Sequence, residues 1–309
     1  MGGQAMIELT GVVKTFGAVR AIDGVDLSIA PGELFGLIGR NGAGKSTLFQ
    51  LMLGLVAADA GDVRIEGVSA RGARFLAIRR TLGYLPENVV LYDNLTGLET
   101  LRFFARLKGV EPAACAPLLE EVGLARAAAR KVREYSKGMK QRLGFAQALL
   151  GDPRLLFLDE PTNGLDPEGI RAFYRILRER QRAGATIVIT SHILAEIQQR
   201  VDRLAIVRAG RLQAVGSVDA LRGETNLPLT IELVLRDDDT RAVEAALRRA
   251  PFGEPTIRGR RIAFACPQHA KMAAIAALSP LAARIVDLHI HEPSLEDVFL
   301  GYAGYEVNA

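Results

Sequence analysis

The chain has 309 residues, of which 49% are hydrophobic and 24% charged, and its formal net charge is +4. That length can hold two domains, and no uncharged apolar run approaches the ~18 to 20 residues that a membrane-spanning helix needs, so we expect no membrane span. Two distant cysteines, Cys115 and Cys266, offer neither a disulfide framework nor a paired zinc spacing, and the basic residues are scattered among 35 acidic ones, which gives nucleic-acid binding little support.

The first seventy residues contain strand-like runs. They are MIELTGVVKTF (6–16), AIDGVDLSIA (21–30) and DVRIEGV (62–68). The opening residues pass directly into this pattern, without the basic and apolar segments of a secretory signal, so we expect a cytoplasmic protein. Phe16 ends the first run and could stack on a base through its aromatic face. A place in the core is the more common role for such a residue.

A glycine-rich loop lies between an apolar strand and a helix in LFGLIGRNGAGKST (34–47). The pattern G-x-x-x-x-G-K-[ST] places backbone N–H groups around phosphate oxygens, Lys45 against the outer phosphates and the Ser46 hydroxyl on Mg²⁺. Gly42 and Gly44 permit backbone angles that a side chain would obstruct. An empty turn is disfavoured because the required strand and helix are both present. The expected binding residues are Gly39, Asn41, Gly42, Ala43, Gly44, Lys45, Ser46 and Thr47.

Residues from about 88 to 150 are expected to be mostly helical, since LTGLETLRFFARLKG (95–109) carries apolar residues at helical spacing. Within this segment, EYSKGMKQR (134–142) is followed by LGFAQALLG. Ser136, with Lys137 and Gly138 after it, is typical of a helix N-terminus that holds an anion.

Three later strands alternate with helices, a rhythm that predicts a parallel sheet and an α/β fold. They are RLLFLDEP (154–161), ATIVITS (185–191) and RLAIVRAG (203–210). The first would carry Asp159 to Mg²⁺ and Glu160 to the attacking water, which Glu160 could orient and deprotonate. His192 follows the second strand, and we assign it to the γ-phosphate as a polarising donor. A solvated acidic cap and a structural histidine are the alternatives.

The pattern changes near Thr225–Pro228. The remaining sequence predicts a strand, a helix, two strands, a helix, a strand and a closing helix at SLEDVFLGY (294–302). We therefore expect a small C-terminal α+β domain at 225–309, after a main domain at 5–224.

Taken together and in this order, these stretches resemble the nucleotide-binding subunit of an ABC transporter over about residues 5–222. GRNGAGKST is similar to the family's phosphate loop, YSKGMKQR to its signature loop, LLFLDEPTNGLDP to its Asp-Glu strand with the following loop that contains Asp166, and TSH to its switch histidine. The resemblance implies a P-loop NTPase with a helical subdomain, ATP and Mg²⁺ as cofactors, and ATP hydrolysis.

The resemblance also implies a homodimer. In this family two domains close face to face, so Ser136 and the N–H groups near Gly138 would bind the γ-phosphate of ATP held by the partner chain. Three positions, in two motifs, depart from the family pattern. Glu87 in LGYLPEN stands where a glutamine is usual and could still ligate the metal, while Lys137 and Met139 replace the more common Gly and Gln.

The same resemblance implies transmembrane permease partners and a peripheral location at the cytoplasmic face of the inner membrane. The tail HEPSLEDVFL is similar to those of exporter ATPases. LGYLPEN, YSKGMKQRLGFAQALLGDPRLLFLDEPT and RLQAVGS resemble the ATPase that serves maturation of nitrous oxide reductase, which would add a periplasmic partner and copper or sulfur as cargo. The residues Cys266, His269, His289 and His291 could suggest a copper path, but structural roles are the more common ones.

Three alternatives stay open. The first is the ATPase of a drug, antibiotic or lipid exporter. The second is a soluble ABC ATPase acting on nucleic acid or ribosomes, although such proteins usually carry paired domains, coiled-coil arms or basic linkers that this sequence lacks. The third is an inactive regulatory subunit, against which the presence of Glu160 and His192 argues.

Overall fold

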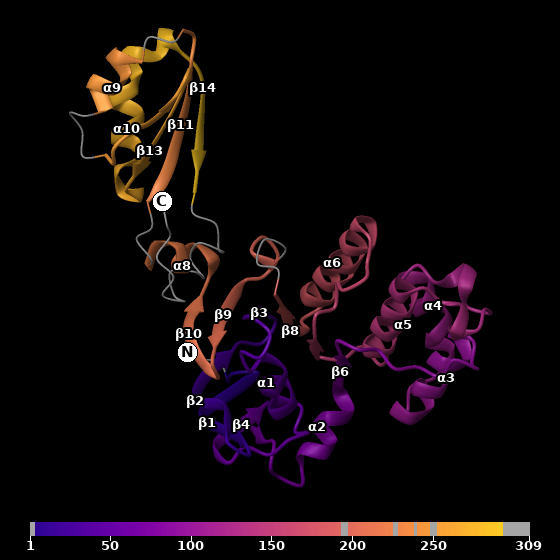
Figure 1. Cartoon of the computed structure of the whole chain (residues 1–309). Helices are drawn as coiled ribbons and strands as arrows, with labels where there is room; N and C mark the ends of the chain where they lie inside the picture. The colour runs from indigo at the N-terminus through magenta and orange to yellow at the C-terminus, as the bar shows by residue number, and fades with distance from the viewer. Residues whose placement is uncertain (1–3, 193–196, 225–227, 238–239, 248–251, 293–309) are drawn as a thin grey trace. The chain divides into compact units, whose positions relative to one another are not determined.

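The computed structural model of the chain describes residues 4–192, 197–224, 228–237, 240–247 and 252–292 (Figure 1). The chain separates into two units, Met1–Gly216 and Ser217–Ala309. The sequence predicts this division at 224/225. It falls earlier because helix α8 (Val218–Glu224) groups with the second unit.

The first sheet of the N-terminal unit is antiparallel, with strand order β2-β1-β4-β5. Its strands are β1 (Ile7–Phe16), β2 (Val19–Ile29), β4 (Ala60–Ile65) and β5 (Val68–Ser69). Apolar and polar residues alternate at the start of β1 and towards the end of β2, so these strands bury one face and expose the other.

The second sheet has strand order β10-β9-β3-β8-β7-β6 and is parallel except for β10. Its strands are β3 (Leu34–Ile38), β6 (Leu82–Leu85), β7 (Leu155–Leu158), β8 (Thr186–Ser191), β9 (Arg203–Arg208) and β10 (Arg211–Gly216). Every residue of β3, β7 and β8 is buried, as expected of central parallel strands covered on both faces. The predicted α/β core is therefore confirmed.

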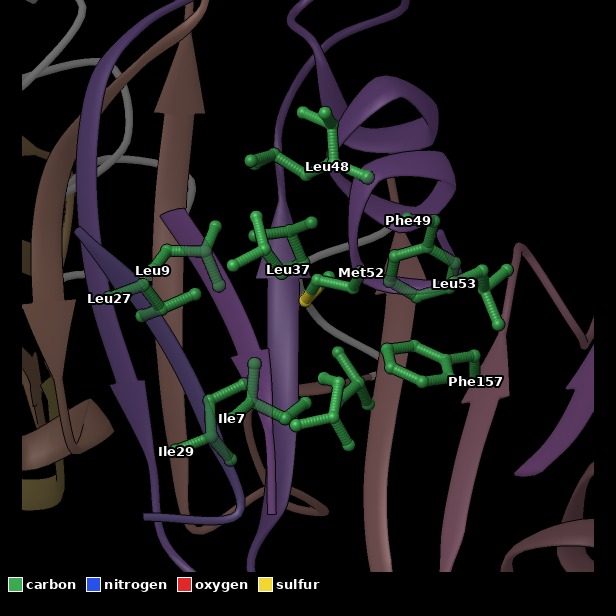
Figure 2. Close-up of a cluster of buried hydrophobic side chains, with 14 of the residues drawn as sticks. Ile7, Leu9, Leu27, Ile29, Leu37, Leu48, Phe49, Met52, Leu53 and Phe157 are labelled. Carbon is green, nitrogen blue, oxygen red and sulfur yellow. The ribbon is translucent and has the colours of Figure 1, made fainter. Parts of the chain in front are cut away.

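Helix α1 (Lys45–Met52) joins the cores of the two sheets. Figure 2 shows its side chains Leu48, Phe49 and Met52 beside Leu37 of β3 and Phe157 of β7. The rings of Phe49 and Phe157 meet edge to face, with centroids 5.4 Å apart. Side chains from β1 and β2 close the same cluster. Burial of this apolar surface fixes the start of α1, and with it the glycine-rich loop, above the sheet.

The segment 88–150 contains helices and no named strand in the structure, and α3, α4 and α5 gather on one side of this unit in Figure 1. These helices are α3 (Gly97–Lys108), η1 (Pro112–Ala114), α4 (Cys115–Glu121), η2 (Ala125–Ala127), η3 (Val132–Glu134) and α5 (Lys137–Leu149). A capping box of Thr96 and Glu99 fixes the start of α3, and Gly109 ends it. Helices α2 (Phe75–Thr81) and α6 (Pro167–Arg182) complete the unit among the described residues.

The second unit has a four-stranded antiparallel sheet of order β12-β13-β11-β14 with its own core. After α8 its elements are β11 (Leu229–Leu235), α9 (Arg241–Leu247), β12 (Thr256–Arg258), β13 (Arg261–Cys266), η4 (Gln268–Ala270), α10 (Lys271–Leu278), η5 (Ser279–Arg284) and β14 (Ile285–His291). Their order matches the predicted α+β pattern. The predicted closing helix at 294–302 lies outside the described residues. No helix in the described parts of the chain is both long and apolar enough to cross a bilayer.

Candidate functional site

A cavity of about 550 Å³ opens where β3, β7 and β8 end. It brings together most of the residues singled out in the sequence, although they come from segments far apart in the chain. The predicted residues that line it are Asn41, Gly42, Ala43, Gly44, Lys45, Ser46, Thr47, Glu87, Asp159, Glu160 and His192. This placement follows from the parallel sheet, since the carboxyl ends of its strands meet at one edge.

The glycine-rich loop has the backbone that its sequence predicted. Gly42 has φ +79° with open space where a side chain would begin, so the conformation alone requires glycine. At Gly44, φ is +111° and a Cβ would lie 2.8 Å from the carbonyl oxygen of Ala21, so the contact also excludes a side chain. The Lys45 ammonium is buried and donates to the carbonyl oxygen of Gly39 at 2.6 Å. Gly39 itself does not line the cavity but holds this lysine.

The acidic pair follows the last residue of β7. Burial raises the pKa of Asp159 because it desolvates the carboxylate; Glu87 and Glu160 add to the shift, whereas a hydrogen bond from Thr190 opposes it. Glu160 is also buried, and its backbone is left-handed with φ +45°, which is uncommon for a residue with a side chain. Each oxygen of its carboxylate has a different partner. His192 Nδ1 lies 2.7 Å from Oε2, and Lys45 Nζ lies 3.7 Å from Oε1.

The donor set at this edge suits a hard divalent cation, because the Ser46 hydroxyl and the Asp159 and Glu87 carboxylates all supply oxygen. No group of three or more His, Cys, Asp or Glu side chains in the described ranges is arranged to hold a metal by itself. The hydroxyl of Ser46 and the two carboxylates fit Mg²⁺, which is commonly bound by one or two carboxylates together with phosphates of the substrate.

Besides Gly39, four predicted binding residues do not line this cavity. Phe16 is 46% exposed at the end of β1, where Lys14 Nζ lies 5.2 Å from the centroid of its ring. Ser136 caps α5, and its hydroxyl accepts from the Met139 N–H at 3.2 Å. Gly138 approaches a neighbouring loop so closely that a Cβ would lie 2.7 Å from the Gly164 carbonyl oxygen.

The fourth of these residues, Asp166, caps α6. Its Oδ1 accepts from the Gly169 N–H at 2.8 Å and lies 3.3 Å from Arg142 Nη2. Ser136, Gly138 and Asp166 therefore belong to one packed region formed by the starts of α5 and α6, apart from the cavity.

Cys266 does not join the histidines that were considered with it for copper. In the sheet register, His289 lies opposite Glu232, whereas Cys266 lies opposite Leu229, so the two side chains point to opposite faces. Cys266 is buried in the core of the second unit, while His289 and His291 are exposed and contact Asp287 and Glu232. His289 and His291 share one face of β14, with ring centroids 6.2 Å apart, and His269 lies in η4.

A family model described as "ABC transporter" matches residues 22–163. A daunorubicin resistance ATP-binding protein of Streptomyces coeruleorubidus is 34% identical over 306 residues, covering 96% of each chain. The chain belongs to the ABC transporter family of ATP-binding proteins. It therefore binds ATP and hydrolyses it, on a P-loop ABC ATPase fold.

Two further matches extend this result. The Nod factor export ATP-binding protein I of Paraburkholderia xenovorans is 37% identical to this ABC ATPase, over 98% of this chain and 99% of the relative. A dimeric ATP-binding cassette solved in a post-hydrolysis state with ADP and Pi is 25% identical, with a TM-score of 0.64, and covers 69% of this chain.

Sequence reasoning missed several residues around the site of the ABC ATPase. Val19, Arg20 and Ala21 of β2 and the turn at Ala209–Gly210 line the cavity, although no motif marks them. Thr190 and Gln141 contact the acidic segment from outside the cavity: Thr190 bonds both acidic residues, and Gln141 Nε2 donates to the Pro161 carbonyl oxygen at 3.0 Å. Thr190 directly precedes Ser191 and His192 in TSH, and this position at the end of an apolar run was the available signal for it.

Proposed function

We propose that the chain is the ATP-hydrolysing motor of an ABC transporter that exports a drug or antibiotic. The full-length match to a resistance ATPase carries this proposal. It spans both units of the chain, whereas the general family model covers only residues 22–163. A second full-length relative is named for export of a different compound, so export is the shared element and the cargo differs.

The site geometry supports a role for each polar residue. Lys45 would leave the Gly39 carbonyl to neutralise the outer phosphates, and the loop N–H groups would hold the phosphate oxygens. Glu160 would orient and deprotonate the water that attacks the γ-phosphate. An ionised carboxylate only accepts hydrogen bonds, so His192 Nδ1 donates to Glu160 here. A further donation to the phosphate would use Nε2 of the doubly protonated ring, or a ring that has turned away from Glu160.

Ser46, Asp159 and Glu87 would hold Mg²⁺ together with phosphate oxygens. When bound, this ion would neutralise charge on the phosphates during transfer. Phe16 would stack on the adenine beside the cavity, where its ring is half exposed.

We infer that the active form is a homodimer. Ser136, Gly138 and Asp166 lie away from the chain's own cavity, on the starts of α5 and α6, so they would serve the nucleotide of a second copy. The N-terminus of α5 offers backbone N–H groups and a partial positive charge suited to a γ-phosphate. The dimeric, nucleotide-bound cassette similar to this chain supports that arrangement.

A permease would attach the motor to the cytoplasmic face of the inner membrane. A groove of about 320 Å³ between α2–β6 and α3–α5 combines the apolar side chains of Phe104 and Leu107 with the basic residues Arg79, Arg80 and Lys108. Exposed Tyr92 and Phe103 continue the apolar surface, with ring centroids 5.6 Å apart. An amphipathic helix of the permease would fit such a groove.

A role of this chain in the maturation of nitrous oxide reductase, with a periplasmic partner, has less support than export. The relatives named above are described by resistance or export, and Cys266 lies in the core of the second unit, on the opposite face of the sheet from His289 and His291. Action on nucleic acid gains no support from these relatives either.

The test is co-expression of the full chain with the membrane proteins encoded beside it, followed by purification and transport assays in inside-out vesicles. We expect a membrane protein to copurify, to change ATP turnover, and to drive ATP-dependent uptake of daunorubicin used as the probe. Uptake of copper without daunorubicin would favour maturation instead. A chain that stays alone and fully active would contradict the motor assignment.

A further inference from the structure

Thr190 lies in β8, directly beside the acidic end of β7, and its side chain has no exposed surface. Strands β7 and β8 are parallel and pair Leu158 with Ile189, so the next residues along, Asp159 and Thr190, are neighbours. Thr190 does not line the nucleotide cavity. It can therefore affect the site only through the residues that it contacts.

The Thr190 hydroxyl makes two short hydrogen bonds with the two acidic residues. Its oxygen accepts from the Glu160 backbone N–H at 2.8 Å, and the hydroxyl donates to Asp159 Oδ1 at 2.6 Å. The direction of both bonds is fixed, because the backbone N–H can only donate and the ionised carboxylate can only accept. Valine has the same shape but can make neither bond.

The bond to Glu160 matters because the backbone at this residue is left-handed, with φ +45°. A residue with a side chain keeps that conformation only when its surroundings impose it. The conformation brings the Glu160 carboxylate within 2.7 Å of His192 and 3.7 Å of Lys45. Without the Thr190 hydroxyl, a buried N–H would lose its partner and the turn could relax away from this geometry.

We propose that Thr190 is a positioning residue for ATP hydrolysis: its hydroxyl holds Glu160 in the left-handed turn and orients Asp159 toward the cation. The proposal rests on the roles proposed above for these two acidic residues. Thr190 does not line the nucleotide cavity, so its effect passes through the acidic pair and should fall on turnover and on the Mg²⁺ requirement more than on nucleotide binding by the glycine-rich loop.

The test compares Thr190→Val with Thr190→Ser in the full chain. A matched control is Thr186→Val, because Thr186 is equally buried at the other end of β8 and its hydroxyl accepts from the Gly32 N–H at 2.9 Å. The readouts are kcat and KM for ATP, the affinity for ADP without Mg²⁺, and the Mg²⁺ concentration that gives half-maximal ATP binding. Only the first of these requires turnover.

We expect Thr190→Val to lower kcat, and to raise the Mg²⁺ requirement, by about 10- to 100-fold, as is usual when a group that orients a metal ligand is lost. ADP affinity without Mg²⁺ should stay within about twofold of the wild type, because a uniform loss of binding would point to a general disruption instead. Thr190→Ser should keep turnover within about threefold, since the hydroxyl and both bonds remain. Thr186→Val should leave kcat and the Mg²⁺ requirement unchanged.

The proposal is overturned if Thr190→Val matches the wild type in both measurements, if serine fails to rescue it, or if Thr186→Val shows the same losses. Glu160→Gln separates this result from the assignment of the base. Full turnover by that variant would refute Glu160 as the base, while the Mg²⁺ requirement of the Thr190 variants would still test the orientation of Asp159.

Discussion

The carboxylate of Glu160 has two close neighbours in this structure, His192 and Lys45, and both are groups that a γ-phosphate would attract. We expect Glu160→Gln to keep ATP binding but to lower turnover by at least about 100-fold, because general-base assistance is lost. The ATP-bound dimer should accumulate, which light scattering at saturating ATP and Mg²⁺ would detect. Glu8→Gln, a change of an exposed glutamate in β1, is the control. A monomer of Glu160→Gln under these conditions would contradict the prediction.

Asp159 is expected to oppose stability while it serves function. Its pKa is raised, chiefly by burial and further by Glu87 and Glu160, so the charged form costs folding free energy at pH values above that pKa. Asp159→Asn should therefore raise the Tm of the nucleotide-free chain near neutral pH and abolish Mg²⁺-dependent turnover.

The stability gain from Asp159→Asn has a defined pH dependence. Because the folded-state pKa lies above the ordinary value of 3.8, the difference in Tm should shrink as the pH falls through the folded pKa and vanish below about 3.8. Thermal unfolding at a series of pH values measures this trend. A variant that is less stable than the wild type at neutral pH would contradict it.

At the scale of elements, Lys108 links the C-terminal ends of two helices. It lies in the last turn of α3, and its ammonium donates to the carbonyl oxygen of Leu150, the residue that ends α5, at 2.6 Å. A cation at a helix C-terminus is favourable, but burial desolvates this one and lowers its pKa from 10.5 to about 8.

The depressed pKa of Lys108 predicts how stability changes with pH. Between about pH 8 and 10.5 the unfolded chain binds more protons at this residue than the folded chain does, so stability rises with pH. The stability of the wild type relative to Lys108→Met should therefore increase across that window, by at most about 1.4 kcal/mol per pH unit and by less after solvent screening. Chemical denaturation at several pH values tests this. Lys131→Met, at an exposed lysine, is the control.

At the scale of the whole molecule, the two units have separate hydrophobic cores, which predicts that the first can fold without the second. A chain of Met1–Gly216 should unfold cooperatively and bind ATP. If the second unit helps to pair two ATPase chains, its removal should weaken ATP-dependent dimerisation by about 100-fold or more, since a linked second contact adds that much. Analytical ultracentrifugation with ATP measures it. Unchanged dimerisation and unchanged turnover would contradict this role.

Much of the fold and site was predictable because the decisive residues are close in sequence. The glycine-rich loop, the strand before Asp159 and the cap at Ser136 each depend on local backbone conformation, which a few neighbouring residues specify. The predicted boundary between the units differs from the one in the structure because no glycine- or proline-rich linker marks Gly216–Ser217. The composition of the helix that follows, α8, does not differ from that of the segment before it.

The sequence by itself determined the phosphate-binding loop, the acidic pair and the α/β class, because short motifs and their spacing fix backbone angles and the alternation of strands with helices. Only the tertiary structure decided which distant side chains meet these groups. The carbonyl oxygen of Ala21 lies against Gly44, and Gln141 donates to Pro161. Thr190 bonds both Asp159 and Glu160. The partners in each contact are too far apart in sequence for a local pattern to predict them. Such contacts depend on how strands align and helices pack, and packing is a property of the whole core.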